Sequence, residues 1–115
     1  MLFELIPFTA RSPLFHDAVR VYCTVWQRAT DDSTVFFRKY TQMPDFVGYV
    51  ARVETDVVGV VFGVASQTGQ WWPDQVARQV GRRHHALQRA WILTELAVLA
   101  PYRKHRIGSH LLERV

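Results

Sequence analysis

The sequence is poor in cysteine and has no long apolar run. Its 115 residues include one cysteine, Cys23, so an internal disulfide is excluded and a reducing compartment fits. Cys23 lies within an apolar helical pattern, which favours a small buried hydrophobe over a nucleophile. No run approaches the ~20 apolar residues of a membrane span, and the N-terminal apolar run around Glu4 is too short for a signal peptide. We expect a cytoplasmic protein.

Residues at metal-ligand spacing are also missing. His84 and His85 are adjacent and cannot share a helix face, and His105 and His110 are five apart. No cysteine or carboxylate stands at ligand spacing to them. We therefore expect no metal site.

Composition and charge indicate one small soluble domain. Hydrophobic residues make up 49% and charged residues 21%, which is ordinary for a globular protein with one core. The formal charge is +4 and the pI about 9.7. This balance favours anionic partners such as a nucleotide cofactor, although it would also suit nucleic acid.

The first part of the chain predicts a strand and two helices. Residues 2–8 alternate as a strand, and a first helix should start at the N-cap Ser12 and reach about residue 28. Asp31, Asp32 and Ser33 form a second N-cap cluster before a helix over residues 34–42. The residues expected to point inward are Phe15, Ala18, Val19, Tyr22, Val25, Trp26, Val35, Phe36 and Tyr40. The aromatic residues of the second helix could also line a substrate pocket, but their spacing favours core.

Two further strands follow, over residues 45–53 and 56–65. The short polar connection between them predicts an antiparallel hairpin. The second of these strands is apolar on both faces, which is typical of a central strand. Gly59 and Gly63 indicate either a bulge or close helix packing.

Residues 71–90 are basic and contain a tryptophan pair, Trp71 and Trp72. We expect a turn there and two short helical pieces. Three roles are open: a solvated surface, a lid that places an anionic acceptor, or a nucleic-acid contact in which the tryptophans stack beside Arg82 and Arg83.

The last quarter of the chain organises the rest. Residues 91–98 predict a strand that stops before Pro101, and residues 103–106 form a basic loop before a helix opening at Ile107. The first amides of a helix lack internal acceptors and lie at the positive end of its dipole. Gly108 leaves room for a phosphate to approach the backbone. This stretch therefore predicts an anion site.

The stretch LAVLAPYRKHRIGSHLLERV resembles the acetyl-coenzyme A (acetyl-CoA) motif of the GNAT N-acetyltransferase superfamily, Arg/Gln-x-x-Gly-x-Gly/Ala after a Leu-x-Val-like strand end. Arg103 takes the Arg/Gln position and Gly108 the second Gly position. Arg106 stands in the first Gly position, and His110 stands where the family has a small residue. The resemblance implies an α/β (α+β) fold, with a mixed, mostly antiparallel sheet flanked by helices. The two helices after the first strand would help to form the acceptor side.

The resemblance further implies acetyl transfer from acetyl-CoA, as co-substrate, to a primary amine of a small molecule or protein. The strand would splay from its neighbour, pair with the pantetheine arm, and polarise the thioester carbonyl through an amide near Val98. The cofactor-binding residues would be Leu96, Ala97, Val98, Arg103, Lys104, His105, Arg106, Ile107, Gly108 and Ser109. Glu95, the one carboxylate of the strand, is either the catalytic base with a raised pKa or a solvent-facing residue at the strand end.

Family members continue beyond the motif, so residues 1–115 would form one partial GNAT domain with a basic insertion at 71–90. The uncovered sheet edge predicts a homodimer or completion by a missing C-terminal segment. A non-catalytic acyl-CoA-binding or interaction module is the alternative function. Nucleic-acid binding rests on charge alone.

Overall fold

The computed structural model describes residues 2–65 and 91–115. The turn and the helical pieces predicted within residues 66–90, with their tryptophan and histidine pairs, lie outside the described residues.

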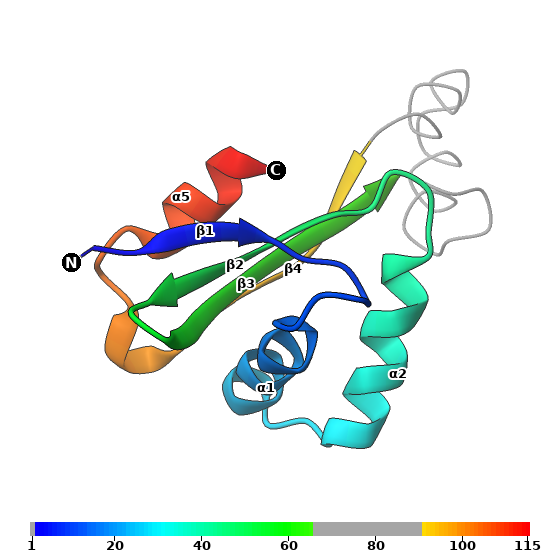
Figure 1. The fold of residues 1–115 in the computed structure, drawn as a ribbon, viewed down its shortest axis with the longest axis horizontal. Helices are drawn as coiled ribbons and strands as arrows, with labels where there is room; N and C mark the ends of the chain where they lie inside the picture. Colours follow the sequence, from blue (N-terminus) through cyan, green and yellow to red (C-terminus); the bar gives the residue numbers. More distant parts are fainter. Residues whose placement is uncertain (1, 66–90) are drawn as a thin grey trace, which may run out of the picture.

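The described strands form one antiparallel sheet in the order β1-β2-β3-β4 (Figure 1). Its strands are β1 (Glu4–Pro7), β2 (Val47–Val53), β3 (Asp56–Ala65) and β4 (Trp91–Val98). The predicted strands reappear with ends that differ by at most two residues, and the hairpin between β2 and β3 is confirmed. Within the described part of the chain, β4 pairs with β3 alone, so its other edge carries no strand.

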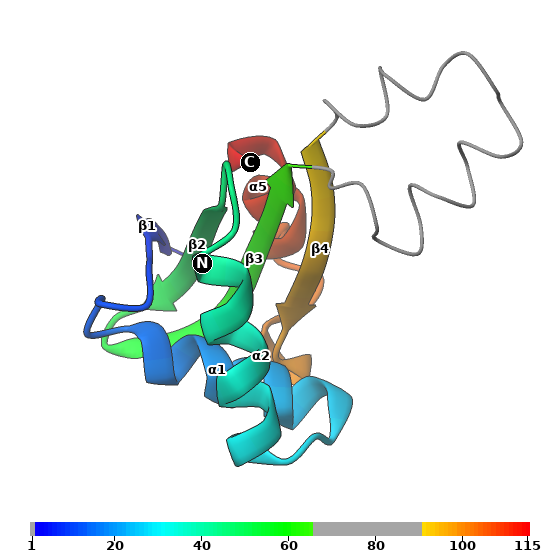
Figure 2. The same cartoon turned by 90° about the vertical axis from the view of Figure 1, so that its right-hand side faces the viewer.

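Helices cover both faces of the sheet (Figure 2). Helices α1 (Phe15–Trp26) and α2 (Thr30–Thr41) pack on one face, while α5 (Ile107–Arg114) packs on the other. A short 3-10 turn, η2 (Ala100–Tyr102), joins β4 to the loop before α5. The sheet thus separates the α1/α2 side of the molecule from the α5 side.

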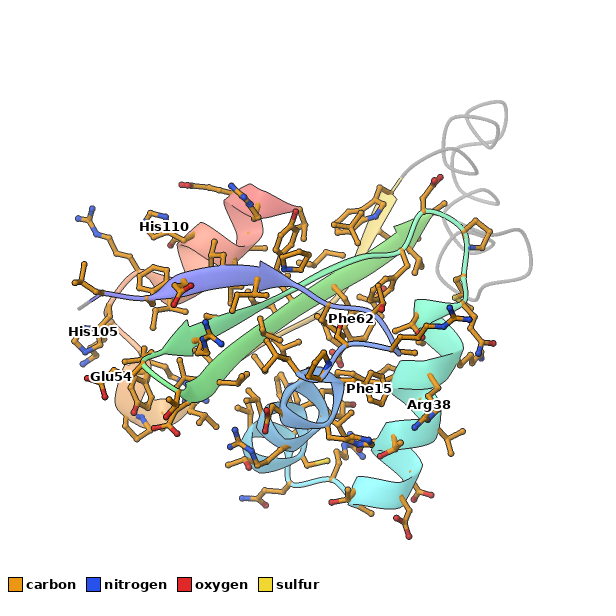
Figure 3. All side chains as sticks on the ribbon, viewed as in Figure 1. Phe15, Arg38, Glu54, Phe62, His105 and His110 are labelled. Atoms are coloured by element: carbon orange, nitrogen blue, oxygen red, sulfur yellow. The ribbon has the colours of Figure 1, made fainter. Side chains whose placement is uncertain are left out.

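The core lies on both sides of β3, whose eight inner residues are all buried. Val61 belongs to the α5 side, and Phe62 packs on the α1/α2 side against an aromatic cluster (Figure 3). Aromatic side chains bury large apolar areas, and edge-to-face pairs add to that burial. The members of this cluster are Phe15, Tyr22, Phe36, Phe37, Tyr40, Phe46 and Phe62.

The predicted helix starts were wrong. The Ser12 hydroxyl accepts the Thr9 amide at 2.8 Å, so it closes the preceding turn, and α1 begins at Phe15. Helix α2 begins at Thr30, four residues before the predicted start, because Asp31 and Asp32 lie inside its first turn. Carboxylates are favourable there, since the dipole is positive at that end.

Two inward assignments were also wrong. Val35 is 69% exposed and Trp26 51% exposed, whereas Phe37 and Val21 are buried. The earlier start of α2 explains Val35, because the face that meets the sheet is set by Ser33 and Phe37.

Each glycine of β3 has one of the two predicted roles. A Cβ on Gly59 would lie 3.1 Å from Leu111 of α5, so this position allows close helix packing. Gly63 lies at an irregularity between β3 and β4, where a Cβ would lie 2.3 Å from the carbonyl oxygen of Ile92. Strand β4 carries one extra residue there: Phe62 pairs with Glu95 and Gly63 with Leu93, so Thr94 has no counterpart on β3.

Candidate active site

The loop before α5 is fixed to the end of β4. Arg103 donates from Nε to the carbonyl oxygen of Val98 at 3.0 Å, which closes the loop on the strand. Lys104 and Arg106 adopt positive φ angles of 70° and 64°. Such angles favour glycine, which accounts for the glycine that the motif has at the position of Arg106.

The backbone amides of this loop are open. Within residues 2–65 and 91–115, the amides from Lys104 to Ser109 donate to no protein acceptor, and the first helical bond is donated by His110 to Arg106. Arg106 is the N-cap of α5, and no side chain caps the helix. Amides of this kind bind anions because the helix dipole adds to their partial charge.

The side chains around these amides are basic and exposed. Arg103, Lys104, His105 and Arg106 all face solvent, and no acid lies in the first turn of α5. Gly108 lies within that turn, and a Cβ built on it would lie 3.8 Å from Val98, an ordinary contact. The predicted cofactor-binding residues therefore surround one helix start and the end of one strand.

The residues of β4 point alternately to the two faces. Ala97 is buried on the α1/α2 side, and Leu96 and Val98 pack on the α5 side beside Ile107. Their backbone forms the unpaired edge of the described sheet. A pantetheine chain could add to this edge as a strand does.

Glu95 lies on the α1/α2 side, opposite Phe62. Burial raises the pKa of its carboxyl, while the positive charge of Arg28 and a hydrogen bond from Tyr22 oppose that rise. The direction is the one expected for a partly buried carboxyl, and the role of Glu95 as base stays a prediction. Burial also raises the pKa of the Tyr22 phenol, and the charge of Glu95 adds to this effect.

Sequence reasoning missed Arg28 as a neighbour of Glu95 and assigned Tyr22 only to the core. More than sixty residues separate both from Glu95, so no spacing rule joins them. The two helices and the pairing of β4 with β3 bring them together. The predicted base and the predicted phosphate loop lie on opposite sides of β4, which is their common support.

Among the described residues, no group of three or more His, Cys, Asp or Glu side chains is placed to hold a metal ion. In the same part of the chain, no helix is long and apolar enough to cross a membrane.

No family model and no curated protein matches this sequence. Solved structures do match its fold. The aminoglycoside acetyltransferase AAC(6')-Iy, in complex with a bisubstrate analogue of coenzyme A, matches 99% of this chain and 69% of its own length, with a TM-score of 0.69 and 9% identity. The ribosomal-protein-alanine N-acetyltransferase of Brucella melitensis biovar Abortus 2308 matches the same shares, with a TM-score of 0.63 and 15% identity.

The aminoglycoside 6'-N-acetyltransferase AAC(6')-Ih of Acinetobacter baumannii matches 98% of this chain and 68% of its own, with a TM-score of 0.66 and 13% identity. This chain therefore has the fold of the GNAT-type acetyltransferases, which confirms the predicted fold class. At these identities, the likeness establishes the fold and leaves the substrate open.

Proposed function

We propose that this chain is an N-acetyltransferase that binds acetyl-CoA at the start of α5 and transfers its acetyl group to a primary amine. The observation that carries the proposal is the set of open amides from Lys104 to Ser109 within a basic loop. Three of the similar acetyltransferase structures contain coenzyme A or an analogue of it. The fold and the helix start support the same ligand.

In this proposal, the pyrophosphate binds the amides of the loop, and the guanidinium of Arg103 adds charge. The Nε of Arg103 is already bonded to Val98, so its outer nitrogens remain for the phosphate. The pantetheine arm pairs with the open edge of β4, and an amide near Val98 polarises the thioester carbonyl. Each of these groups belongs to one continuous strand-loop-helix unit.

Glu95 is the proposed general base. The acceptor nitrogen attacks the thioester carbonyl, the carbon–sulfur bond breaks, and the nitrogen loses a proton to Glu95 directly or through water. The proton finally reaches the departing thiolate, so the products are the amide and the free thiol. Burial raises the pKa of Glu95, which suits a base working near neutral pH.

We further propose that residues 1–115 act within a single acetyltransferase domain with 71–90 as an insertion, and that the protein works in the cytoplasm. The lone cysteine and the choice of acetyl donor support that location. A second copy or a further segment beside β4, along the part of its open edge that the pantetheine arm does not use, is part of the same proposal.

Two assays test the function. Calorimetric titration with coenzyme A measures binding, and release of free thiol from acetyl-CoA in the presence of an amine panel measures transfer. Binding with thiol release supports the enzyme. Binding without release for any amine supports the alternative, a non-catalytic acyl-CoA module whose loop carries Arg106 in place of glycine.

Absence of coenzyme A binding would contradict both the acetyltransferase and the non-catalytic acyl-CoA module. A salt-dependent oligonucleotide shift would then test whether the basic charge serves nucleic acid instead.

A further inference from the structure

A second group of open polar atoms lies on the other side of the sheet, where α2 begins. A cleft of about 390 Å³ opens between the end of α1 and the first turn of α2, a volume within the range of small-molecule sites. It combines aromatic rings with charged and polar groups. Its lining residues are Tyr22, Gln27, Arg28, Ala29, Asp32, Ser33 and Phe36.

The start of α2 is uncapped. Its N-cap is Ala29, which has the extended backbone of a capping residue but no side chain that can accept a hydrogen bond. The first helical bond is donated by the Ser33 amide to Ala29 at 3.1 Å. Within the described chain, the amides of Thr30, Asp31 and Asp32 have no acceptor. Three donors are therefore free at the positive end of a twelve-residue helix.

Ser33 gives an independent indication of a ligand. The residue is only 4% exposed, and its hydroxyl makes no hydrogen bond to any described residue. Its side chain lines the cleft. The hydroxyl reaches the cleft, so a donor or acceptor atom of a ligand there can form the hydrogen bond that Ser33 lacks within the described residues.

Arg28 adds a full positive charge to the same cleft. It forms no ion pair with the acids of the described chain, although it lines the cleft with Asp32. An arginine without a carboxylate partner can bind one from a ligand through two parallel hydrogen bonds. Asp32 opposes a second negative charge, so a single carboxylate fits this cleft better than a dianion.

Tyr22 connects the cleft with the proposed base. Its ring lines the cleft and stacks on Phe36 at 5.7 Å between ring centres, and its hydroxyl is near enough to Glu95 to influence the pKa of that carboxyl. Arg28 forms no salt bridge with Glu95, although its positive charge lowers the pKa of that carboxyl. An acceptor can therefore place one group at Arg28 and another at Glu95.

We propose that this cleft binds a carboxylate of the acceptor, so that the acceptor is a small amine that also carries one carboxylate group. The inference rests on the proposed function, because it assigns the amine to Glu95 and the carboxylate to Arg28, Ser33 and the open amides of α2. The carboxylate supplies the cap that Ala29 lacks. Amines that carry only positive charges meet the unpaired guanidinium of Arg28 and bind less well.

A matched pair of acceptors tests this inference in the full 115-residue chain. β-Alanine and β-alaninamide share the same amine and differ only in the carboxylate. With acetyl-CoA saturating, we expect kcat/KM to be about tenfold or more higher for β-alanine, as expected for one charge-assisted contact. Arg28→Gln should lower this preference about tenfold. Arg28→Lys should lower it less, because lysine keeps the positive charge but cannot form two parallel hydrogen bonds to the carboxylate.

Ser33→Ala should lower the same preference by a smaller factor. Arg11→Gln is the control, because Arg11 is exposed outside the cleft and the change in charge is the same. An unaltered preference in Arg28→Gln, or equal use of both acceptors by the wild type, overturns the inference while acetyl transfer stands.

Titration of the labelled chain with β-alanine, without acetyl-CoA, gives a readout independent of turnover. The amide resonances of Thr30 and Asp31 should shift in the wild type and remain in place in Arg28→Gln. No shift at these amides overturns the carboxylate site. A shift without any binding of coenzyme A at α5 instead contradicts the proposed function and leaves a carboxylate site standing.

Discussion

The helices α2 and α5 both begin without a side-chain cap, and the charges around their first turns differ. Helix α5 starts at Arg106 among exposed basic residues, with no acid in its first turn. Helix α2 starts at Ala29, with Asp31 and Asp32 in its first turn and Arg28 just before it. Both helices present open amides at their N-termini. The neighbouring side chains are basic at α5 and of both signs at α2, so the two starts differ in local charge.

The comparison shows how the two proposed ligands would bind at separate places on one small chain. A diphosphate suits the start of α5, where nothing repels it. The acids at the start of α2 would repel a diphosphate, while a single carboxylate can still reach Arg28. Strand β4 stands between the two starts and carries Glu95 toward the second.

The largest effect on the rate should come from removing the proposed base while both helix starts remain intact. Glu95→Gln should lower kcat about 100-fold or more, because a general base contributes at least that much. Affinity for coenzyme A should stay as in the wild type, and saturating β-alanine should still shift the amides of Thr30 and Asp31, because the proposed carboxylate site is intact. Glu113→Gln is the control on an exposed acid of α5. An unchanged kcat removes Glu95 from the mechanism.

The same variant has a pH signature. Burial raises the pKa of Glu95, so the wild-type rate should rise with pH as that group ionises, and this limb should vanish in Glu95→Gln. A raised carboxyl pKa stabilises the fold at pH below the unfolded value and loses that contribution as pH rises through the folded value. Thermal stability should therefore vary less with pH in the variant than in the wild type between the unfolded and the folded pKa of Glu95.

The start of α5 is tested by filling the space at Gly108. Gly108→Val should weaken coenzyme A binding about tenfold or more, because a branched side chain blocks approach to the amides. Gly108→Ala is the graded partner, since its Cβ would make only a 3.8 Å contact with Val98. Calorimetry measures the affinity, and melting curves show whether the fold survives. Wild-type affinity in Gly108→Val contradicts the phosphate site.

The start of α2 is tested by giving it the missing cap. Ala29→Ser should stabilise the chain by about 1 kcal/mol, because the backbone already has capping geometry. The same hydroxyl should compete with the acceptor and lower the preference for β-alanine. Ala100→Ser, in an exposed turn, is the control. Denaturant melts measure the stability, and kcat/KM for the two acceptors measures the preference. A rise in both stability and preference for β-alanine would contradict the proposed carboxylate site.

The smallest effect concerns the strained start of α5. Arg106→Gly should stabilise the chain by about 0.5 kcal/mol, because relief of the left-handed conformation exceeds the flexibility that glycine adds. Lys104→Gly, at a φ of 70°, is the matched control for strain elsewhere in the loop. If coenzyme A binding improves in Arg106→Gly alone, the side chain hinders the ligand. If it weakens there alone, the guanidinium takes part.

Elements fixed by local pattern could be predicted from the sequence. The strand ended by Pro101, the helix opening at Ile107 and the hairpin around residues 54–55 appear as expected. Their signals are short runs with strong stop residues. The residues of the proposed phosphate loop are neighbours in the chain, so their place around one helix start could be predicted in the same way, while phosphate binding there stays a prediction.

Tertiary choices could not be predicted. Ser12 offered a capping hydroxyl, and the fold uses it for the turn before α1. Val35 matched the helical period, yet Phe37 took the buried place once α2 began earlier. The acceptor cleft is the extreme case, because Tyr22, Ser33 and Glu95 approach one another only after two helices pack on the sheet.

The unpaired Thr94 sets the side of the sheet to which Glu95, the proposed base, points. Side chains of a regular strand alternate, and in an unbroken β4 that keeps Thr94 the carboxylate of Glu95 would emerge beside α5, on the side of the proposed phosphate loop. The extra residue reverses that alternation for the last four positions of the strand. Because Thr94 is the residue without a counterpart, deleting it would leave Glu95 opposite Phe62, whereas a register in which Thr94 pairs with Phe62 would turn Glu95 to the α5 side.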